Sequence, residues 1–174
     1  MILRMFSMTI VSVLMVACSQ TQAPIKTMER VDLDRFMGDW YVVANIPTFI
    51  EKGAHNAVES YRMNKDGTIA TTFTFNEGSF KGERKTYSPT GFIKDKKSNA
   101  VWGMQFIWPI KADYRIVYVD ADYTQTIVGR NARDYVWIMG RKPVIPADDY
   151  RKLLMLLEKQ GYDISKIKRV PQKW

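Results

Sequence analysis

Between Val31 and Arg141, apolar and polar residues alternate in short runs that are separated by glycine, aspartate, asparagine and proline. This period of two is typical of half-buried β-strands, because successive side chains point to opposite faces of a sheet. The short connections Asn64–Gly67 and Asn131–Asp134 predict hairpins between antiparallel neighbours. The pattern predicts eight strands, at Trp40–Ile46, Ala57–Met63, Thr68–Phe75, Gly82–Tyr87, Ala100–Ile107, Asp113–Val119, Thr124–Arg130 and Tyr135–Arg141.

Eight sequential antiparallel strands can close into an up-and-down β-barrel. Closure removes the exposed edges of the sheet and leaves an interior about wide enough for one small ligand. The expected fold is therefore all-β, an eight-stranded antiparallel barrel, and the expected activity is binding.

The period changes after the strands. Pro146 precedes a stretch whose apolar side chains share one helical face, and Gly161 follows it as a stop signal. The residues of that face are Tyr150, Leu153, Leu154 and Leu157. We expect one C-terminal α-helix packed on the outside of the barrel, followed by a short strand at Ile167–Val170.

The N-terminal segment has the features of a lipoprotein signal. Met5–Ala17 is apolar, follows Arg4 and is shorter than the roughly 20 residues that a spanning helix needs. It ends directly before Cys18, which we interpret as the acylated first residue of the mature chain. Acylation with more than one chain would make membrane attachment stable. This interpretation divides the chain into a signal peptide at 1–17, an extended tether at 18–30 and one globular domain at 31–174.

Composition narrows the function. The chain is 46% hydrophobic and 13% aromatic, which is ample for one core, and Cys18 is its only cysteine, so no intramolecular disulfide can form. The net charge of +8 could favour an anionic lipid surface, but the basic clusters are sparse and no nucleic-acid motif accompanies them. We predict no nucleic-acid binding. Ser19 after the lipidated cysteine favours sorting to the outer membrane, on its periplasmic side.

Three short motifs occur at particular places relative to the predicted strands. Gly38-Asp39-Trp40-Tyr41 opens the first strand, Asp120–Tyr123 lies between the sixth and seventh, and Arg141 ends the eighth. Together they resemble the signature regions of the lipocalins, and after a lipoprotein signal they resemble the bacterial outer-membrane lipocalins. The resemblance implies a carrier of lipids that are shed or damaged in the cell envelope, with a role in membrane lipid maintenance.

The same residues have a structural interpretation. Closing one end of a barrel needs a large flat side chain and a group that holds it, and Trp40 and Arg141 suit those roles. An arginine over an indole gains cation–π attraction, and its donors can reach nearby carbonyls. Gly38 leaves room for that approach. We predict that these three residues close the barrel.

Alternation then predicts which side chains line the interior. If Trp40 points inward, its partners two residues apart along the strand do so too, and the more apolar face is chosen in the other strands. The predicted ligand-binding wall comprises Val42, Ala44, Ile46, Tyr61, Phe73, Phe75, Trp102, Met104, Phe106, Tyr114, Ile116, Tyr118, Tyr135, Trp137 and Met139. Such a wall suits an acyl chain with its polar head at the opening, as in a fatty acid or lysophospholipid. Glu59 is interpreted either as a head-group contact or as a solvated carboxylate at the rim.

Other functions are poorly supported by the sequence. His55 is the only histidine, Gly-x-Ser-x-Gly is absent, and no cysteine is free to complete a metal site, so we predict no enzyme, metal or cofactor, haem included. A lipid-modifying enzyme at the barrel opening and a structural barrel packed solid remain as alternatives. The sequence also leaves open whether two barrels pair as a homodimer.

Overall fold

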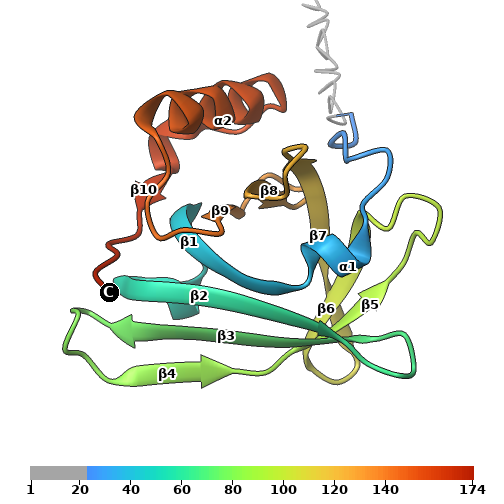
Figure 1. The fold of residues 1–174 in the computed structure, drawn as a ribbon, viewed down its shortest axis with the longest axis horizontal. Coiled ribbons are helices and arrows are strands. Elements are labelled where there is room, and N and C mark those ends of the chain that lie inside the picture. Colours follow the sequence, from blue (N-terminus) through green and yellow to red (C-terminus); the bar gives the residue numbers. More distant parts are fainter. Residues whose placement is uncertain (1–22) are drawn as a thin grey trace, which may run out of the picture.

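The computed structural model describes residues 23–174, so the predicted signal peptide and Cys18 lie outside the described residues. The strands form one antiparallel sheet that closes where β1 pairs with β9 (Figure 1). The predicted eight-stranded barrel is thereby confirmed. Its uninterrupted strands are β1 (Gly38–Ile46), β2 (Ala54–Met63), β3 (Ile69–Glu77), β6 (Val101–Ile107), β7 (Ile110–Val119), β8 (Gln125–Gly129) and β9 (Val136–Gly140).

The fourth position of the barrel is divided between two short strands, β4 (Arg84–Tyr87) and β5 (Thr90–Ile93), which both pair with β3. Pro89 separates them, because proline has no N–H to donate to the ladder. Only β5 continues the sheet to β6. The predicted strand at Gly82–Tyr87 therefore covers only the first half of this position.

The ladders contain four register shifts, and two of them reverse side chains that alternation assigns to the interior. The ladder between β1 and β9 contains an extra residue, Val43, and the ladder between β7 and β8 contains another, Val117. One extra residue exchanges the two faces for the remainder of a strand. Strict alternation therefore fails beyond both bulges.

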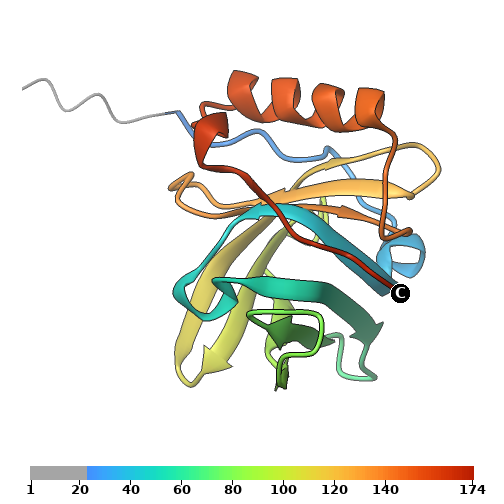
Figure 2. The same ribbon diagram turned by 90° about the vertical axis from the view of Figure 1, so that its left-hand side faces the viewer.

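The buried apolar residues form two clusters separated by the sheet. The inner cluster fills the closed half of the barrel and includes Phe36, Trp40 and Trp102. The outer cluster lies between the sheet and α2 (Ala147–Lys159), which contributes Leu153 and Leu157. Figure 2 shows α2 lying across the outside of the barrel, as predicted.

Smaller elements complete the fold. The short helix α1 (Leu33–Phe36) was not predicted; Asp32 caps it by accepting the Arg35 N–H at 3.2 Å. Two 3₁₀ helices follow β1 and α2, namely η1 (Phe49–Glu51) and η2 (Ile164–Lys166), and the expected last strand is the short β10 (Lys168–Arg169), which pairs with β1. Within residues 23–174, no helix is long and apolar enough to cross a membrane.

Candidate functional site

Trp40 and Arg141 lie against each other at the closed end of the barrel. The indole is fully buried, and the guanidinium carbon of Arg141 lies 3.8 Å from the ring centroid. Gly38 has a φ of +93°, and a Cβ there would lie 3.3 Å from the Arg141 guanidinium. The guanidinium donates hydrogen bonds of 2.7, 2.8 and 2.7 Å to the carbonyls of Arg35, Met37 and Asp39. The predicted contact between arginine and indole is present, and it ties the last strand to the first.

A cavity of 490 Å³ occupies the opposite, open half of the barrel. Its walls come from β2, β3, β4, β6, β7 and β9 and from the connections at the open end. The lining residues are Thr48, Phe49, Ile50, Glu51, Glu59, Phe73, Tyr87, Ser88, Pro89, Met104, Phe106, Ile107, Ala112, Asp113, Tyr114, Arg130, Tyr135 and Trp137. Most of this surface is aromatic or aliphatic, so the cavity suits an apolar ligand.

Part of the predicted wall lines this cavity. These residues are Phe73, Met104, Phe106, Tyr114, Tyr135 and Trp137. Others face the interior and are buried in the inner cluster without lining the cavity, namely Val42, Tyr61, Phe75, Trp102, Ile116 and Met139. Trp102, for example, stacks on Tyr114 with ring centroids 5.7 Å apart. The closed half of the barrel is thus filled by side chains, and only the open half is hollow.

The predictions that Ala44, Ile46 and Tyr118 face the cavity were wrong. All three pack in the outer cluster beneath α2. Ala44 and Ile46 follow the bulge at Val43, and Tyr118 follows the bulge at Val117. Because each bulge exchanges the faces of its strand, the side chains assigned to the interior point outward.

Glu51 is the first of two carboxyl groups buried in the cavity wall. Its oxygens accept hydrogen bonds from the Asn45 amide at 2.8 Å, the Thr48 hydroxyl at 2.8 Å and the Trp137 indole at 2.9 Å. Asn45 points inward because it follows the Val43 bulge. Burial raises the pKa of Glu51, and the three donors oppose that rise.

Glu59 is the second buried carboxyl group, and only 7% of it is exposed. Its Oε2 accepts a hydrogen bond of 3.3 Å from the Tyr114 hydroxyl, which also contacts the Tyr61 hydroxyl. Burial raises the pKa of Glu59 to about 7, and the nearby charge of Glu51 adds to the rise. Glu59 is therefore an interior group whose surroundings favour its protonated form, and the interpretation as a solvated rim carboxylate was wrong.

Sequence reasoning missed the part of the site that precedes β2. Phe49, Ile50 and Glu51 line the cavity from η1, a connection that strand alternation does not cover. One signal was present, because Thr48-x-x-Glu51 has the spacing of a capping box at the start of a helical turn. The pattern could have predicted a short helical turn after the first strand, although not that it lines the cavity.

His55 does not line the cavity; its Nδ1 lies 2.9 Å from the Gly53 carbonyl and its ring packs edge-on against Phe80. Among residues 23–174, no group of three or more His, Cys, Asp or Glu side chains is arranged to hold a metal ion.

Comparison with known proteins decides the family. The family model described as a lipocalin-like domain matches residues 31–172. This chain belongs to the lipocalin family. Temperature-induced lipocalin-1 of Arabidopsis thaliana is 31% identical over 85% of this chain and 83% of its own. The outer membrane lipoprotein Blc of Citrobacter freundii is 26% identical over 91% and 90%.

Solved structures agree on the fold. Insecticyanin from the tobacco hornworm Manduca sexta superimposes with a TM-score of 0.67 at 14% identity, over 85% of this chain and 84% of its own. As a lipocalin, this chain is a binding protein for small lipophilic molecules rather than an enzyme. The motifs that carried the resemblance meet at its closed end, where Arg35 of α1 also lies 4.3 Å over the Tyr123 ring.

Proposed function

We propose that this lipocalin binds a fatty acid or a lysophospholipid in its cavity and serves membrane lipid maintenance in the cell envelope. The observation that carries the proposal is the largely apolar cavity of 490 Å³. That volume falls within the roughly 300–1,000 Å³ range of small-molecule sites. An empty space of this size favours a carrier over a structural barrel that is packed solid.

The polarity of the cavity supports entry with the acyl chain first. Glu51 and Glu59 lie in the wall, where an incoming carboxylate or phosphate would meet two acidic groups. At the entrance, the guanidinium carbon of Arg130 lies 5.2 Å from the centroid of the Tyr135 ring, and its Nε lies 3.4 Å from Oδ1 of Asp134. An anionic head group is therefore better accommodated beside Arg130 than inside.

Filling the cavity should remove bound lipid. Ala112 lies on β7, lines the cavity and pairs with Met104. Ala112→Trp would place an indole in the space that an acyl chain needs. The expected result is a drop of about tenfold or more in lipid retained per chain, as for the loss of one well-buried apolar contact surface. The measurement is mass spectrometry of lipids extracted from the full-length protein purified from membranes.

The matched control is Ala121→Trp, which adds the same indole at an exposed position of the β7–β8 connection. It should retain lipid as the wild type does. Wild-type protein that carries no fatty acid or lysophospholipid, and gains none on titration, would favour the packed structural barrel. If Ala112→Trp and Ala121→Trp retain equal amounts of lipid, the cavity is not the binding site.

We also propose that Cys18 carries the lipid anchor and that the protein resides on the periplasmic side of the outer membrane. Support comes from the signal-like segment before Cys18 and from Ser19 after it. The names of the relatives from Citrobacter freundii and Vibrio cholerae, outer membrane lipoprotein Blc, point to the same membrane.

Cys18→Ala should abolish acylation. Cells grown with an alkyne-bearing palmitic acid are expected to label the wild-type chain and the control Ser19→Ala, but not Cys18→Ala, because only the thiol is the acceptor. The variant should also leave the outer-membrane fraction. Label that persists in Cys18→Ala would refute the anchor.

A further inference from the structure

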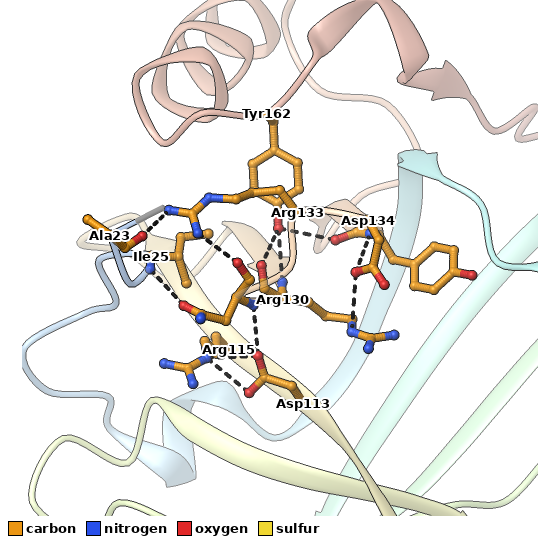
Figure 3. A network of polar contacts seen from close by, with 10 residues as sticks. Ala23, Ile25, Asp113, Arg115, Arg130, Arg133, Asp134 and Tyr162 are labelled. Atoms are coloured by element: carbon orange, nitrogen blue, oxygen red, sulfur yellow. Dashed lines mark hydrogen bonds and ion pairs between the residues drawn. The ribbon is translucent and has the colours of Figure 1, made fainter. Parts of the chain in front are cut away.

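The chain that leads toward Cys18 is fixed to the rim of the barrel. Arg133, in the β8–β9 connection, donates a hydrogen bond of 2.8 Å to the Ala23 carbonyl (Figure 3). The side-chain oxygen of Asn131, in the same connection, accepts the Ile25 N–H at 3.0 Å. Ile25 is itself buried in the outer cluster. From Ala23 onward, the segment expected to be a tether therefore packs on the domain.

The connection that holds this segment is itself braced. Arg133 donates to the Gln160 carbonyl at 3.0 Å, beyond the end of α2. The Asn131 N–H donates to Asp113 at 2.7 Å, and the Tyr162 hydroxyl accepts the Arg130 N–H at 2.9 Å (Figure 3). Contacts from β7 and from beyond α2 thus hold the attachment point in place.

This attachment point lies at the open end. Arg130 and Tyr135, which flank the β8–β9 connection, both line the cavity. In Figure 2 the described chain begins (blue) on the side where the β1–β2, β6–β7 and β8–β9 connections lie, and α1 lies on the other side. Four residues separate Cys18 from Ala23. Five steps of at most ~3.6 Å give a reach of roughly 18 Å, so an acylated Cys18 keeps the membrane near the opening.

The same end carries four strongly exposed large apolar side chains. Phe49 in η1 is 81% exposed, and Ile107, Trp108 and Ile110 in the β6–β7 hairpin are 72%, 82% and 69% exposed. We call these four residues the apolar rim. Exposed apolar side chains that gather at one end of a domain mark an interaction site, and tryptophan favours the interface between lipid and water. Lys52 and Lys81, which are exposed in connections at the same end, could meet lipid phosphates.

We propose that the apolar rim seats on the bilayer to which Cys18 is anchored, so that the cavity opens onto the membrane and lipid enters it without crossing water. This rests on the proposed function, because it needs the anchor at Cys18. Two separate features indicate that the apolar rim contacts the bilayer: the short reach of the tether and the apolar side chains that surround the opening. The alternative partner of the apolar rim is a second copy of the chain.

The test uses the full-length lipoprotein in vesicles of phosphatidylethanolamine and phosphatidylglycerol that contain acyl-brominated lipid, which quenches tryptophan on contact. The wild type should show a quenched component that Trp108→Phe loses. The control Trp174→Phe, at a side chain 62% exposed that contacts Tyr41, should keep it. An unchanged quenched component in Trp108→Phe would overturn the proposal. If quenching is absent and the β6–β7 hairpins of two chains can be crosslinked, the apolar rim contacts a second copy of the chain. That result would also overturn the proposal.

A second measurement separates this inference from the proposed function. Trp108 and Ile110 do not line the cavity, so Trp108→Glu/Ile110→Glu should leave the lipid bound at equilibrium unchanged. The rate at which this double variant takes up lysophospholipid from vesicles should fall about tenfold or more, because charged side chains replace two membrane contacts. Val144→Glu/Met155→Glu, exposed away from the apolar rim, should take up lipid at the wild-type rate. Unchanged uptake by the rim variant with normal binding would refute the inference alone, and absent binding in the wild type would refute the carrier function.

Discussion

Trp40→Ala is expected to lower the free energy of unfolding by about 3–5 kcal/mol, the range for truncating a fully buried tryptophan. The effect should be large because the closed end is densely packed. Trp40 lies 5.2 Å from Phe36 between ring centroids, donates to the Phe36 carbonyl at 2.8 Å and supports the guanidinium of Arg141. Removing the indole leaves a cavity and removes the surface that positions Arg141.

The measurement is denaturant unfolding followed by circular dichroism. Trp108→Ala is the control, because the same truncation at a side chain 82% exposed should change stability by no more than about 0.5 kcal/mol. A similar small loss in both variants would mean that the closed end does not stabilise the barrel.

Glu59→Gln is expected to stabilise the protein at pH 8 by about 3 kcal/mol and to leave it nearly unchanged at pH 4. Burial raises the pKa of Glu59 from 4.5 to about 7. Each unit of difference between the folded and unfolded pKa corresponds to about 1.4 kcal/mol. The folded state holds this proton between the two values and the unfolded state does not, so wild-type stability falls as pH rises from about 4.5 through 7 and then levels off.

Glutamine carries no charge to bury, so Glu59→Gln should lose this decline. The measurement is the free energy of unfolding across pH 4–8. Glu158→Gln, on the exposed face of α2, should follow the wild-type profile. A decline of wild-type size in Glu59→Gln would place the titrating group elsewhere, with buried Glu51 as the first candidate.

Lipid binding should depend on the same proton. An acyl chain against Glu59 removes water from the carboxyl group and further favours its neutral form. Binding to the wild type should therefore weaken as pH rises through 7, whereas Glu59→Gln should bind with little dependence on pH.

The elements that local pattern determines were predicted well. Alternation located the seven uninterrupted strands and β4 but not β5, and Pro146, the apolar face of the helix and Gly161 located α2. The closed end was also predictable, because Trp40 lies before the bulge in β1 and Arg141 directly follows β9, whose inward and outward side chains alternate without a bulge of their own. Pro89 was a visible signal for the break between β4 and β5 that alternation overlooked.

The interior could be predicted only in part. Val43 and Val117 each add one residue to a ladder, and neither has a side chain that distinguishes a bulge from regular strand. Their consequence is that Ala44, Ile46 and Tyr118 face α2 while Asn45 faces Glu51. A bulge depends on how neighbouring strands curve to close the barrel, so one strand's sequence does not specify it.

The amino-acid sequence by itself determined the fold class, the helix, the pair that closes the barrel and an apolar interior, because these follow from periodicity and residue type. Only the tertiary structure decided how much of the interior is hollow, that Glu51 and Glu59 are buried in its wall, and that Ala23 is held beside the opening. Those features depend on contacts between segments far apart in the chain, which fix burial and register through packing that no local pattern records.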